Sequence, residues 1–216
     1  MKRALTGCGV LYAVLTVGSC KRFDSRFEVG RRAYDKQDYA TALNEWKPLA
    51  EKGYAMAQNS LGFLYARGHG VAQDYAEAAR WYRKAAEQGF AEAQFNLGLV
   101  YFKGEGVTQD LAEAVRYYRK AAEQGNAGGQ FNLGFHYHKG LGVVQDYAEA
   151  LNWYRKAAEQ GNAEAQLLLG YMYDKGQGVP QDYVEAHMWY NLAASRASAE
   201  LQKRIADGRD SLAGKM

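Results

Sequence analysis

Residues 91–126 read AEAQFNLGLVYFKGEGVTQDLAEAVRYYRKAAEQGN, and residues 127–162 read AGGQFNLGFHYHKGLGVVQDYAEALNWYRKAAEQGN. These two stretches agree at 25 of 36 positions without an insertion. A similar stretch precedes them and another follows, so that four blocks adjoin: 55–90, 91–126, 127–162 and 163–198. A fixed period of this length is typical of repeat proteins, in which each unit stacks on the next.

Each block has the pattern of two helices. In the first half, A-x-x-Q-x-x-L-G-x-x-Y places Leu97, Gly98 and Tyr101 on one helical face. Glycine inside a helix costs about 1 kcal/mol relative to alanine. This cost recurs in every block, at Gly62, Gly98, Gly134 and Gly170. We therefore expect the backbone of a neighbouring helix to approach closely there, where a Cβ would clash.

The turn and the second helix of each block also have a repeated pattern. The first helix is predicted to end at glycines suited to a left-handed cap: Gly68, Gly104, Gly140 and Gly176. The second is predicted to begin at Asp74, Asp110, Asp146 and Asp182, each followed by Glu three residues later, which is the capping-box spacing. In the first block, its buried stripe is Ala78, Trp81, Tyr82 and Ala85, and its solvated face is Arg80, Arg83, Lys84 and Glu87.

The segments on either side of the blocks extend this design. Ser25 and Glu28 predict the start of a helix that runs to Tyr34, and a second helix begins at Asp38, with Pro48 expected to break or kink it. Residues 25–54 thus form a degenerate opening unit. At the other end, residues 199–216 predict a polar capping helix, which repeat arrays need to cover an open apolar end.

The blocks resemble the Sel1-like repeat, a relative of the tetratricopeptide repeat with a longer glycine-rich loop between its helices. The residues that carry this resemblance in one block are Ala91, Gln94, Leu97, Gly98, Tyr101, Gly104, Gly106, Val107, Asp110, Ala114, Tyr118, Ala121 and Gly125. The resemblance implies an all-α fold, a right-handed α-solenoid of stacked antiparallel helix pairs. It also implies that residues 25–54 are a tetratricopeptide-like unit.

The N-terminus has the three parts of a secretory signal peptide over residues 1–19: a short basic start, an apolar run and small residues at the close. A plain N-terminal anchor is the alternative, although the apolar run is shorter than the roughly 20 residues of a membrane span. Residues 17–20, Val-Gly-Ser-Cys, resemble the bacterial lipobox, with Val where Leu is usual. That resemblance implies that Cys20 is the first mature residue and is acylated, whereas ordinary signal peptidase would cut here without lipidation. We expect an exported protein of the bacterial cell envelope, periplasmic or membrane-anchored as a lipoprotein.

Composition argues against several kinds of function. The formal net charge is +3, and Lys2 and Arg3 supply two of these charges, so no concentrated basic face for nucleic acid is expected. Both cysteines lie in the first twenty residues, which leaves the repeats without a thiol for a disulfide or a metal. His136 and His138 are two residues apart and would point away from each other on a helix. We therefore expect neither a metal nor a cofactor.

In tetratricopeptide relatives the first helices line the concave side, which implies a groove here. Its central row would be Phe63, Leu99, Phe135 and Tyr171, its next row would include Phe102 and His138, and its cationic rim would be Arg67, Lys103, Lys139 and Lys175. Apolar residues beside a cationic rim predict that the groove binds a peptide or helix with some acidity.

The alternative is that these aromatic side chains belong to the core. It applies most strongly to the row Asn59, Phe95, Phe131 and Leu167, which could pack between repeats. Because Phe95 and Phe131 stand where the carboxylate clamp of chaperone-binding relatives needs Lys, we do not expect that clamp.

The sequence therefore predicts a non-catalytic protein–protein interaction scaffold or adaptor, without a small-molecule substrate. The alternative comes from secreted bacterial Sel1-repeat proteins described as β-lactamases or penicillin binders. Those relatives carry paired cysteines in each repeat, which these blocks lack, and no Ser-x-x-Lys motif occurs after residue 20.

Overall fold

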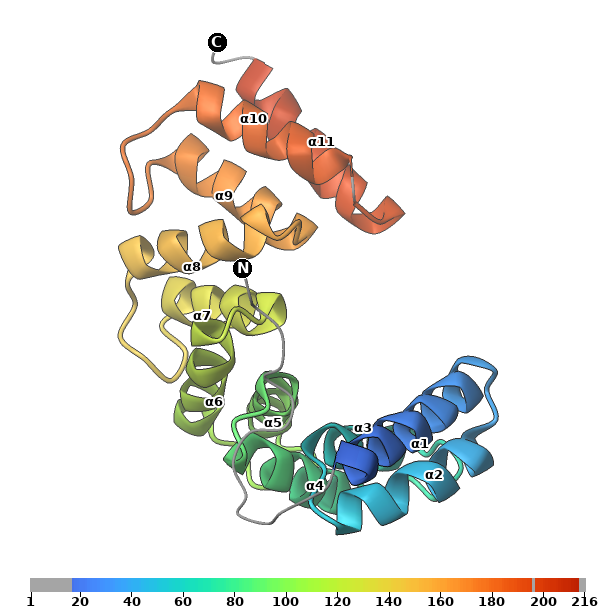
Figure 1. Ribbon diagram of the computed structural model, residues 1–216. Helices are drawn as coiled ribbons and strands as arrows, with labels where there is room; N and C mark the ends of the chain where they lie inside the picture. The colour runs from blue at the N-terminus through green and yellow to red at the C-terminus, as the bar shows by residue number, and fades with distance from the viewer. Residues whose placement is uncertain (1–16, 196, 214–216) are drawn as a thin grey trace. The chain divides into compact units, whose positions relative to one another are not determined.

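The computed structural model describes the backbone of residues 17–195 and 197–213 and the side chains of residues 25–195 and 197–212. In these residues, eleven helices pack as consecutive antiparallel pairs (Figure 1). They are α1 (Val17–Asp35), α2 (Tyr39–Glu51), α3 (Ala55–Arg67), α4 (Tyr75–Glu87), α5 (Ala91–Lys103), α6 (Leu111–Glu123), α7 (Ala127–Lys139), α8 (Tyr147–Glu159), α9 (Ala163–Lys175), α10 (Tyr183–Ala194) and α11 (Ala199–Ala213). The predicted all-α fold of antiparallel helix pairs is confirmed.

Contacts divide the chain into two compact units, with the boundary between Ala85 and Ala86 in α4. The core of the first unit includes Phe27, Trp46, Leu61, Leu64 and Trp81. The second unit has one cluster that includes Val115, Tyr118, Leu133 and Trp153, and another that includes Leu169, Met172, Tyr190 and Ile205. Each unit thus has its own apolar core.

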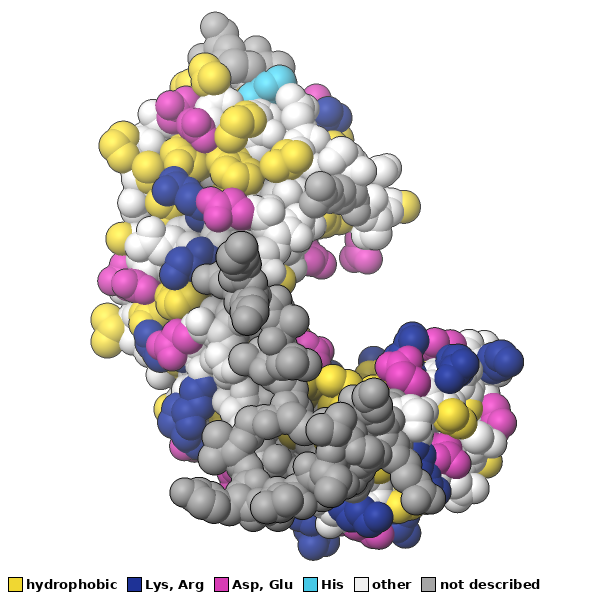
Figure 2. All heavy atoms as spheres, viewed as in Figure 1, with side chains coloured by type: hydrophobic (Ala, Val, Ile, Leu, Met, Phe, Trp, Pro, Cys, Tyr) yellow, Lys and Arg dark blue, Asp and Glu magenta, His cyan; other side chains and the backbone are white. Residues whose placement is uncertain are grey.

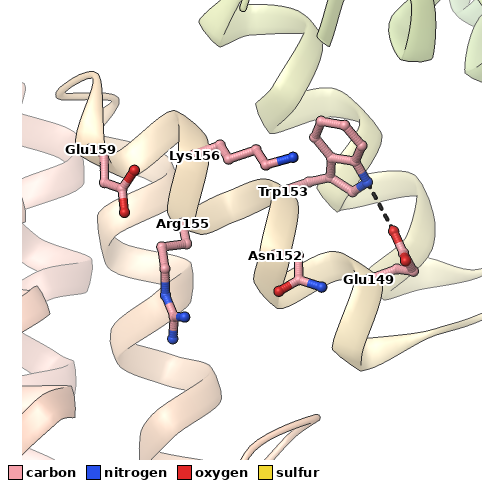
Figure 3. Close-up of a pocket in the computed structure, with 6 residues that line it drawn as sticks. All are labelled: Glu149, Asn152, Trp153, Arg155, Lys156 and Glu159. Carbon is pink, nitrogen blue, oxygen red and sulfur yellow. Dashed lines mark hydrogen bonds between the residues drawn. The ribbon is translucent and has the colours of Figure 1, made fainter. Parts of the chain in front are cut away.

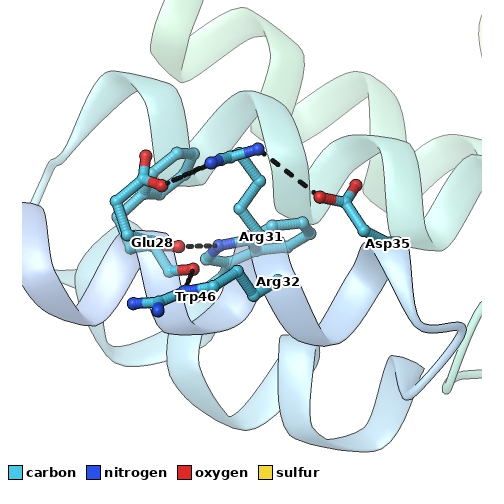
Figure 4. A network of polar contacts seen from close by, with 6 residues as sticks. Glu28, Arg31, Arg32, Asp35 and Trp46 are labelled. Atoms are coloured by element: carbon cyan, nitrogen blue, oxygen red, sulfur yellow. Dashed lines mark hydrogen bonds and ion pairs between the residues drawn. The ribbon is translucent and has the colours of Figure 1, made fainter.

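Polar contacts on α1 accompany the core of the first unit. Figure 4 shows Arg31 between Glu28 and Asp35, with ion-pair distances of 2.7 and 3.4 Å, on an exposed face. The indole Nε1 of Trp46 donates to the backbone carbonyl of Phe27 at 3.1 Å. The bond from Arg31 lowers the pKa of the Glu28 carboxyl. The ion pairs of Arg31 lie within α1, and such surface pairs contribute little, whereas the buried indole of Trp46 joins α2 to α1.

The glycines inside the first helices of the blocks each face an aromatic ring. A Cβ on Gly134 would lie 2.8 Å from the ring of Tyr154 and 3.2 Å from the carbonyl oxygen of Ala150. The same contact recurs in each block, in the pairs Gly62–Tyr82, Gly98–Tyr118, Gly134–Tyr154 and Gly170–Tyr190. The expected close approach is therefore present. Its nearest atoms belong to the tyrosine ring, and a backbone carbonyl oxygen of the neighbouring helix comes next, at 3.1–3.3 Å.

The glycine-rich loop packs on the preceding block. Gly142 has φ +71°, and a Cβ there would lie 2.5 Å from the backbone carbonyl of Leu111, at the start of α6. Gly178 makes the equivalent approach to Tyr147. Glycine is needed at both positions, because the left-handed backbone and the lack of space each disfavour a side chain.

The predicted helix caps are confirmed. Gly68, Gly104, Gly140 and Gly176 are all left-handed, with φ between 64° and 72°. The carboxylate of Asp110 accepts hydrogen bonds from the N–H groups of Ala112 and Glu113 at 3.0 and 2.9 Å. In a capping box, the side chain of Glu113 would also accept from the N–H of Asp110. Here that N–H donates to the carbonyl of Tyr101 instead, and Glu113 pairs with Arg116.

In the opening unit, the predicted helix start at Ser25 is wrong, and the predicted break at Pro48 does not occur. Helix α1 begins at Val17, so Ser25 lies inside the helix; serine costs little at an exposed helical position such as this. Helix α2 continues to Glu51 with Pro48 inside it. Proline removes only the bond to the carbonyl four residues earlier, and the next two residues, Leu49 and Ala50, are buried in the core of the first unit.

Residues 1–16 of the predicted signal peptide and the side chain of Cys20 lie outside the described residues. Of the helices that are described, none is long and apolar enough to span a membrane. At the other end, α11 matches the expected capping helix, with Leu201, Ile205 and Leu212 buried.

Candidate binding face

In the second unit, the central row of the predicted groove is partly accessible. Leu99 on α5 and Phe135 on α7 are half-buried, while Tyr171 on α9 is 39% exposed. Leu99 and Phe135 each pack with one edge against a core cluster. These side chains are therefore held in place by the fold, and part of their apolar surface stays available.

Lysines occupy the last residue of α5, α7 and α9. Lys103, Lys139 and Lys175 are all exposed. Lys103 Nζ lies 3.5 Å from Glu105, and Lys175 Nζ lies 3.0 Å from Asp174. A cation in the last turn also complements the helix dipole, so a structural role accounts for part of this pattern. We call Leu99, Phe102, Phe135, Tyr171, Lys103, Lys139 and Lys175 the A-helix face.

The next row is mixed, and one of its predicted members is buried. The ring of Phe102 is half-buried and meets the ring of His136 edge-on, with centroids 5.4 Å apart. His138 is only 6% exposed, and its ring packs edge-on against Tyr147 and Tyr154 of α8. The prediction that His138 lines an accessible groove is therefore wrong, because this part of α7 turns toward its partner helix.

In the first row, Phe95 and Phe131 pack against tyrosines on the second helix of their own blocks. The ring centroid of Phe95 lies 6.2 Å from that of Tyr118, and the centroid of Phe131 lies 5.9 Å from that of Tyr154. Leu167 is 6% exposed. Leu167 thus belongs to the core, whereas Phe95 and Phe131 are half-buried, as Leu99 and Phe135 are.

In the first unit, Phe63 belongs to an aromatic cluster. Its ring meets Tyr34 edge-on at 5.9 Å, and the guanidinium of Arg67 lies 5.4 Å from its centroid. His69 stacks on Tyr39 at 4.1 Å and shares a hydrogen bond of 3.3 Å with the hydroxyl of Tyr34. The predicted pair Phe63 and Arg67 is thus held by the loop of its own block and by the opening unit. Sequence analysis missed this cluster, because Tyr34 and Tyr39 lie outside the repeats.

A small pocket adjoins Tyr171, between α9 and α11, with a volume of about 290 Å³. Leu167, Tyr171 and Asp174 line one side, and Arg204 and Asp207 line the other. Asp174 is 3% exposed and stands where earlier blocks have Ala66, Phe102 and His138. The sequence could not predict this pocket, because α11 does not follow the repeat.

The outer face of α8 has a hollow of about 420 Å³ that only its own side chains line (Figure 3). The indole Nε1 of Trp153 donates to the carboxylate of Glu149 at 3.0 Å. Lys156 Nζ lies 4.0 Å from the Trp153 ring. The side chains of Glu149, Trp153 and Lys156 therefore already interact with one another.

On the outer face of α10 the repeat pattern changes. Val184, Met188 and Leu192 are exposed at a spacing of four residues. At the middle position earlier blocks carry Arg80, Arg116 and Asn152, and at the last position they carry Lys84, Lys120 and Lys156. Figure 2 shows hydrophobic side chains gathered over α10. The last block thus presents Met188 and Leu192 where earlier blocks carry Arg, Lys or Asn, and Val184 where they carry Ala.

Polar side chains that sequence analysis did not single out join neighbouring blocks. The buried amide of Gln130 donates to the carbonyl of Ala122 at 3.2 Å and accepts from Gln160 at 2.7 Å. Arg155 donates to the hydroxyl of Tyr173 at 2.6 Å, and Arg119 donates likewise to Tyr137. The arginines at this position were expected on the solvated face. In these two blocks they hold the next block instead.

The described residues contain no group of three or more His, Cys, Asp or Glu side chains that could hold a metal ion. The recurring aspartates cap helices, as Asp146 does with the N–H of Ala148 at 2.9 Å. Of the glutamates three residues later, Glu77 and Glu113 pair with arginines and Glu149 accepts from Trp153. These carboxylates thus have structural partners.

A family model described as Sel1 repeat matches residues 55–90, 91–126, 127–162 and 163–198. Among solved structures, a Sel1 repeat protein from Oxalobacter formigenes is 41% identical, with a TM-score of 0.76 over 84% of this chain and 74% of that one. The protein c5321, described as a protective antigen of uropathogenic Escherichia coli strains with an SLR fold, is 39% identical with a TM-score of 0.80.

That match covers 89% of this chain and 44% of c5321, so the chain spans less than half the length of this relative. A protein from Klebsiella pneumoniae subsp. pneumoniae, described under the same repeat name, is 20% identical with a TM-score of 0.59. The alignment covers 88% of this chain and 95% of that one, and it shows likeness of fold alone. None of the curated proteins matches this chain.

Proposed function

The chain belongs to the Sel1 repeat family, and we propose that it works as a non-catalytic scaffold or adaptor that binds a peptide or helix of another protein. The observation that carries this proposal is the A-helix face, where partly accessible apolar side chains run beside exposed lysines on three successive first helices. Apolar anchors beside a charged rim are the usual components of a protein-binding surface.

The fixed positions of these anchors favour binding. Leu99 and Phe135 are half-buried and packed against core residues, so little side-chain freedom is left to lose when a partner covers them. The lysines attract an acidic segment and act mainly on its rate of association. The expected partner segment therefore presents apolar side chains next to Asp or Glu.

We propose further that the protein is exported and anchored in the bacterial cell envelope through acylated Cys20. The support is the lipobox-like residues 17–20 after a basic start and an apolar run. The description of the Escherichia coli relative as a protective antigen also supports an exported chain. Because a single acyl chain binds a membrane only marginally, two chains or a second signal would be needed.

The lipidation is tested by measuring the mass of the mature N-terminus and the membrane fraction of the protein. We expect an acylated Cys20 in membranes, and a Cys20→Ala variant that is unprocessed or released into the soluble envelope fraction. Wild-type protein that salt alone removes from membranes, with no acyl mass, would contradict the anchor.

The binding proposal is tested by photocrosslinking in native envelopes, with a photoreactive amino acid placed at one position at a time. Tyr171 lies on the A-helix face, Asn152 on the outer face of α8 and Met188 on the outer face of α10, and all three are exposed. We expect a discrete crosslinked protein from Tyr171 and none from Asn152. Crosslinking from Met188 alone would overturn the proposal and assign binding to the outer face of α10.

An enzyme of the β-lactamase or penicillin-binding kind gains no support from the described residues, because the recurring acidic side chains have capping and pairing roles. The proposal therefore includes no small-molecule substrate, cofactor or nucleic acid.

A further inference from the structure

The third block buries two histidines on one helix. His136 on α7 is 1% exposed, and its Nδ1 lies 2.7 Å from the carbonyl oxygen of Leu141. Because a carbonyl oxygen can only accept, Nδ1 carries the proton and Nε2 is the bare nitrogen. Among the described residues, Nε2 has no hydrogen-bond partner. His138 is 6% exposed, and its Nδ1 likewise has none.

The fold does not need a histidine at either position. Where the third block has His136, the other blocks have Leu64, Val100 and Met172, and where it has His138, they have Ala66, Phe102 and Asp174. The first set is entirely apolar. The two imidazoles are thus departures from the chain's own repeat pattern.

The groups around His136 come from three helices. Phe102 of α5, Tyr118 of α6 and Phe135 of α7 surround its ring, with centroids between 5.3 and 6.1 Å away. The Tyr118 hydroxyl is the titratable group among them, and burial raises its pKa. It has no hydrogen-bond partner among the described residues and carries no charge near neutral pH.

The groups around His138 are similar. Its ring faces Tyr147 and Tyr154 of α8, and the neighbouring Lys139 adds a positive charge. Burial raises the pKa of the Tyr154 hydroxyl, which also lacks a partner among the described residues. The titratable groups near the two rings therefore offer hydroxyls and a cation, and a protonated imidazole would be buried without a compensating negative charge.

We propose that α7 is an acid-sensitive element, in which protonation of His136 and His138 opens the packing of the third block. Phe135 and Lys139, two members of the A-helix face, lie on the same helix. Opening therefore weakens binding at that face as well. This second consequence rests on the proposed function, whereas the opening itself does not.

The direction follows from proton linkage. Burial lowers the pKa of both imidazoles below the ordinary value, against a smaller opposing effect of the Leu141 carbonyl on His136. The opened chain takes up protons near pH 6.5 and the packed chain only at lower pH. Packing is thus most stable above about pH 6.5 and weakens as the pH falls below it. Each histidine increases the opening equilibrium by up to about tenfold per pH unit in this window.

Hydrogen exchange of the full chain tests the opening without any ligand. Protection would be compared at pH 7, 6 and 5, corrected for the intrinsic exchange rate, in α7 and in residues 43–51 of α2, which contain no histidine and exclude Tyr39, the residue that stacks on His69. We expect protection in α7 to fall at least about tenfold more than in α2. An equal fall in both helices would overturn the proposal.

The matched variant copies the second block, with His136→Val and His138→Phe taken from Val100 and Phe102. In this variant, protection in α7 should fall with pH no more than protection in α2 does. A control variant at the unrelated His187, H187Q, should keep the larger fall in α7. If the double variant does not fold, His136→Leu alone, copied from Leu64, should reduce the excess by up to about tenfold per pH unit. Unchanged pH dependence in the folded variant would overturn the proposal. Failure of the binding proposal would appear separately, in the crosslinking from Tyr171.

Discussion

At the residue scale, the contact between Gly134 and Tyr154 shows how a block holds its two helices together. The ring of Tyr154 is completely buried and lies where a side chain on Gly134 would have to be. The glycine costs helix propensity, and the gain is the burial of a large aromatic ring against the neighbouring helix. Glycine at this position thus sets the spacing of the helix pair in all four blocks.

We predict that Gly134→Leu opens the stack locally. Overpacking a tight contact costs on the order of 1–3 kcal/mol, and each block of a repeat array contacts only its neighbours. Hydrogen exchange should therefore lose most protection in residues 91–162. The control is Ala148→Leu, which adds the same side chain at an exposed position of α8. Protection that falls evenly to both ends of the chain would contradict this picture.

His138 shows where residue-level prediction failed. It lies three positions after Phe135, and helical periodicity places both residues on one broad face. How that face is divided between solvent and the partner helix depends on the rotation of α7 about its axis. A single sequence gives no measure of that rotation. Phe135 keeps partial exposure, whereas His138 turns into the contact with Tyr147 and Tyr154.

At the element scale, the repeat register predicts the helices of the blocks well, because glycine and aspartate mark both ends of the loop. The four aspartate caps and the four left-handed glycines lie where the sequence places them. The opening unit is predicted less well, since Ser25 and Pro48 are single signals without a repeat to support them. Pro48 is tolerated in α2 because tertiary packing of the last turn outweighs one lost hydrogen bond.

Contacts between elements were harder to predict than the elements themselves. Arg155 is charged and lies on the polar side of α8, so a solvated position was the natural expectation. The structure instead brings it to the hydroxyl of Tyr173 on α9. The pocket between α9 and α11 and the apolar surface of α10 depend on the place where the repeat stops, which no periodicity describes.

At the scale of the whole molecule, each unit has its own core, and the residues proposed for binding lie on helices of the second unit. Stability and binding are therefore local properties of neighbouring blocks. A ligand that spans α5, α7 and α9 would stabilise these blocks together, because it would bind only their packed form. The proposed acid-sensitive α7 lies in the middle of this set.

The most direct test of the binding proposed at the A-helix face is calorimetry with the partner that crosslinking identifies. Phe135→Ala should weaken binding about thirty-fold, equivalent to about 2 kcal/mol, because it removes a central apolar anchor. Lys139→Glu should have a smaller effect, mainly through the association rate and the dependence on salt. The matched control is Asn152→Ala on the outer face of α8, and circular dichroism would confirm that every variant is folded. Unchanged binding by a folded Phe135→Ala variant, together with loss of binding by Asn152→Ala, would contradict the account.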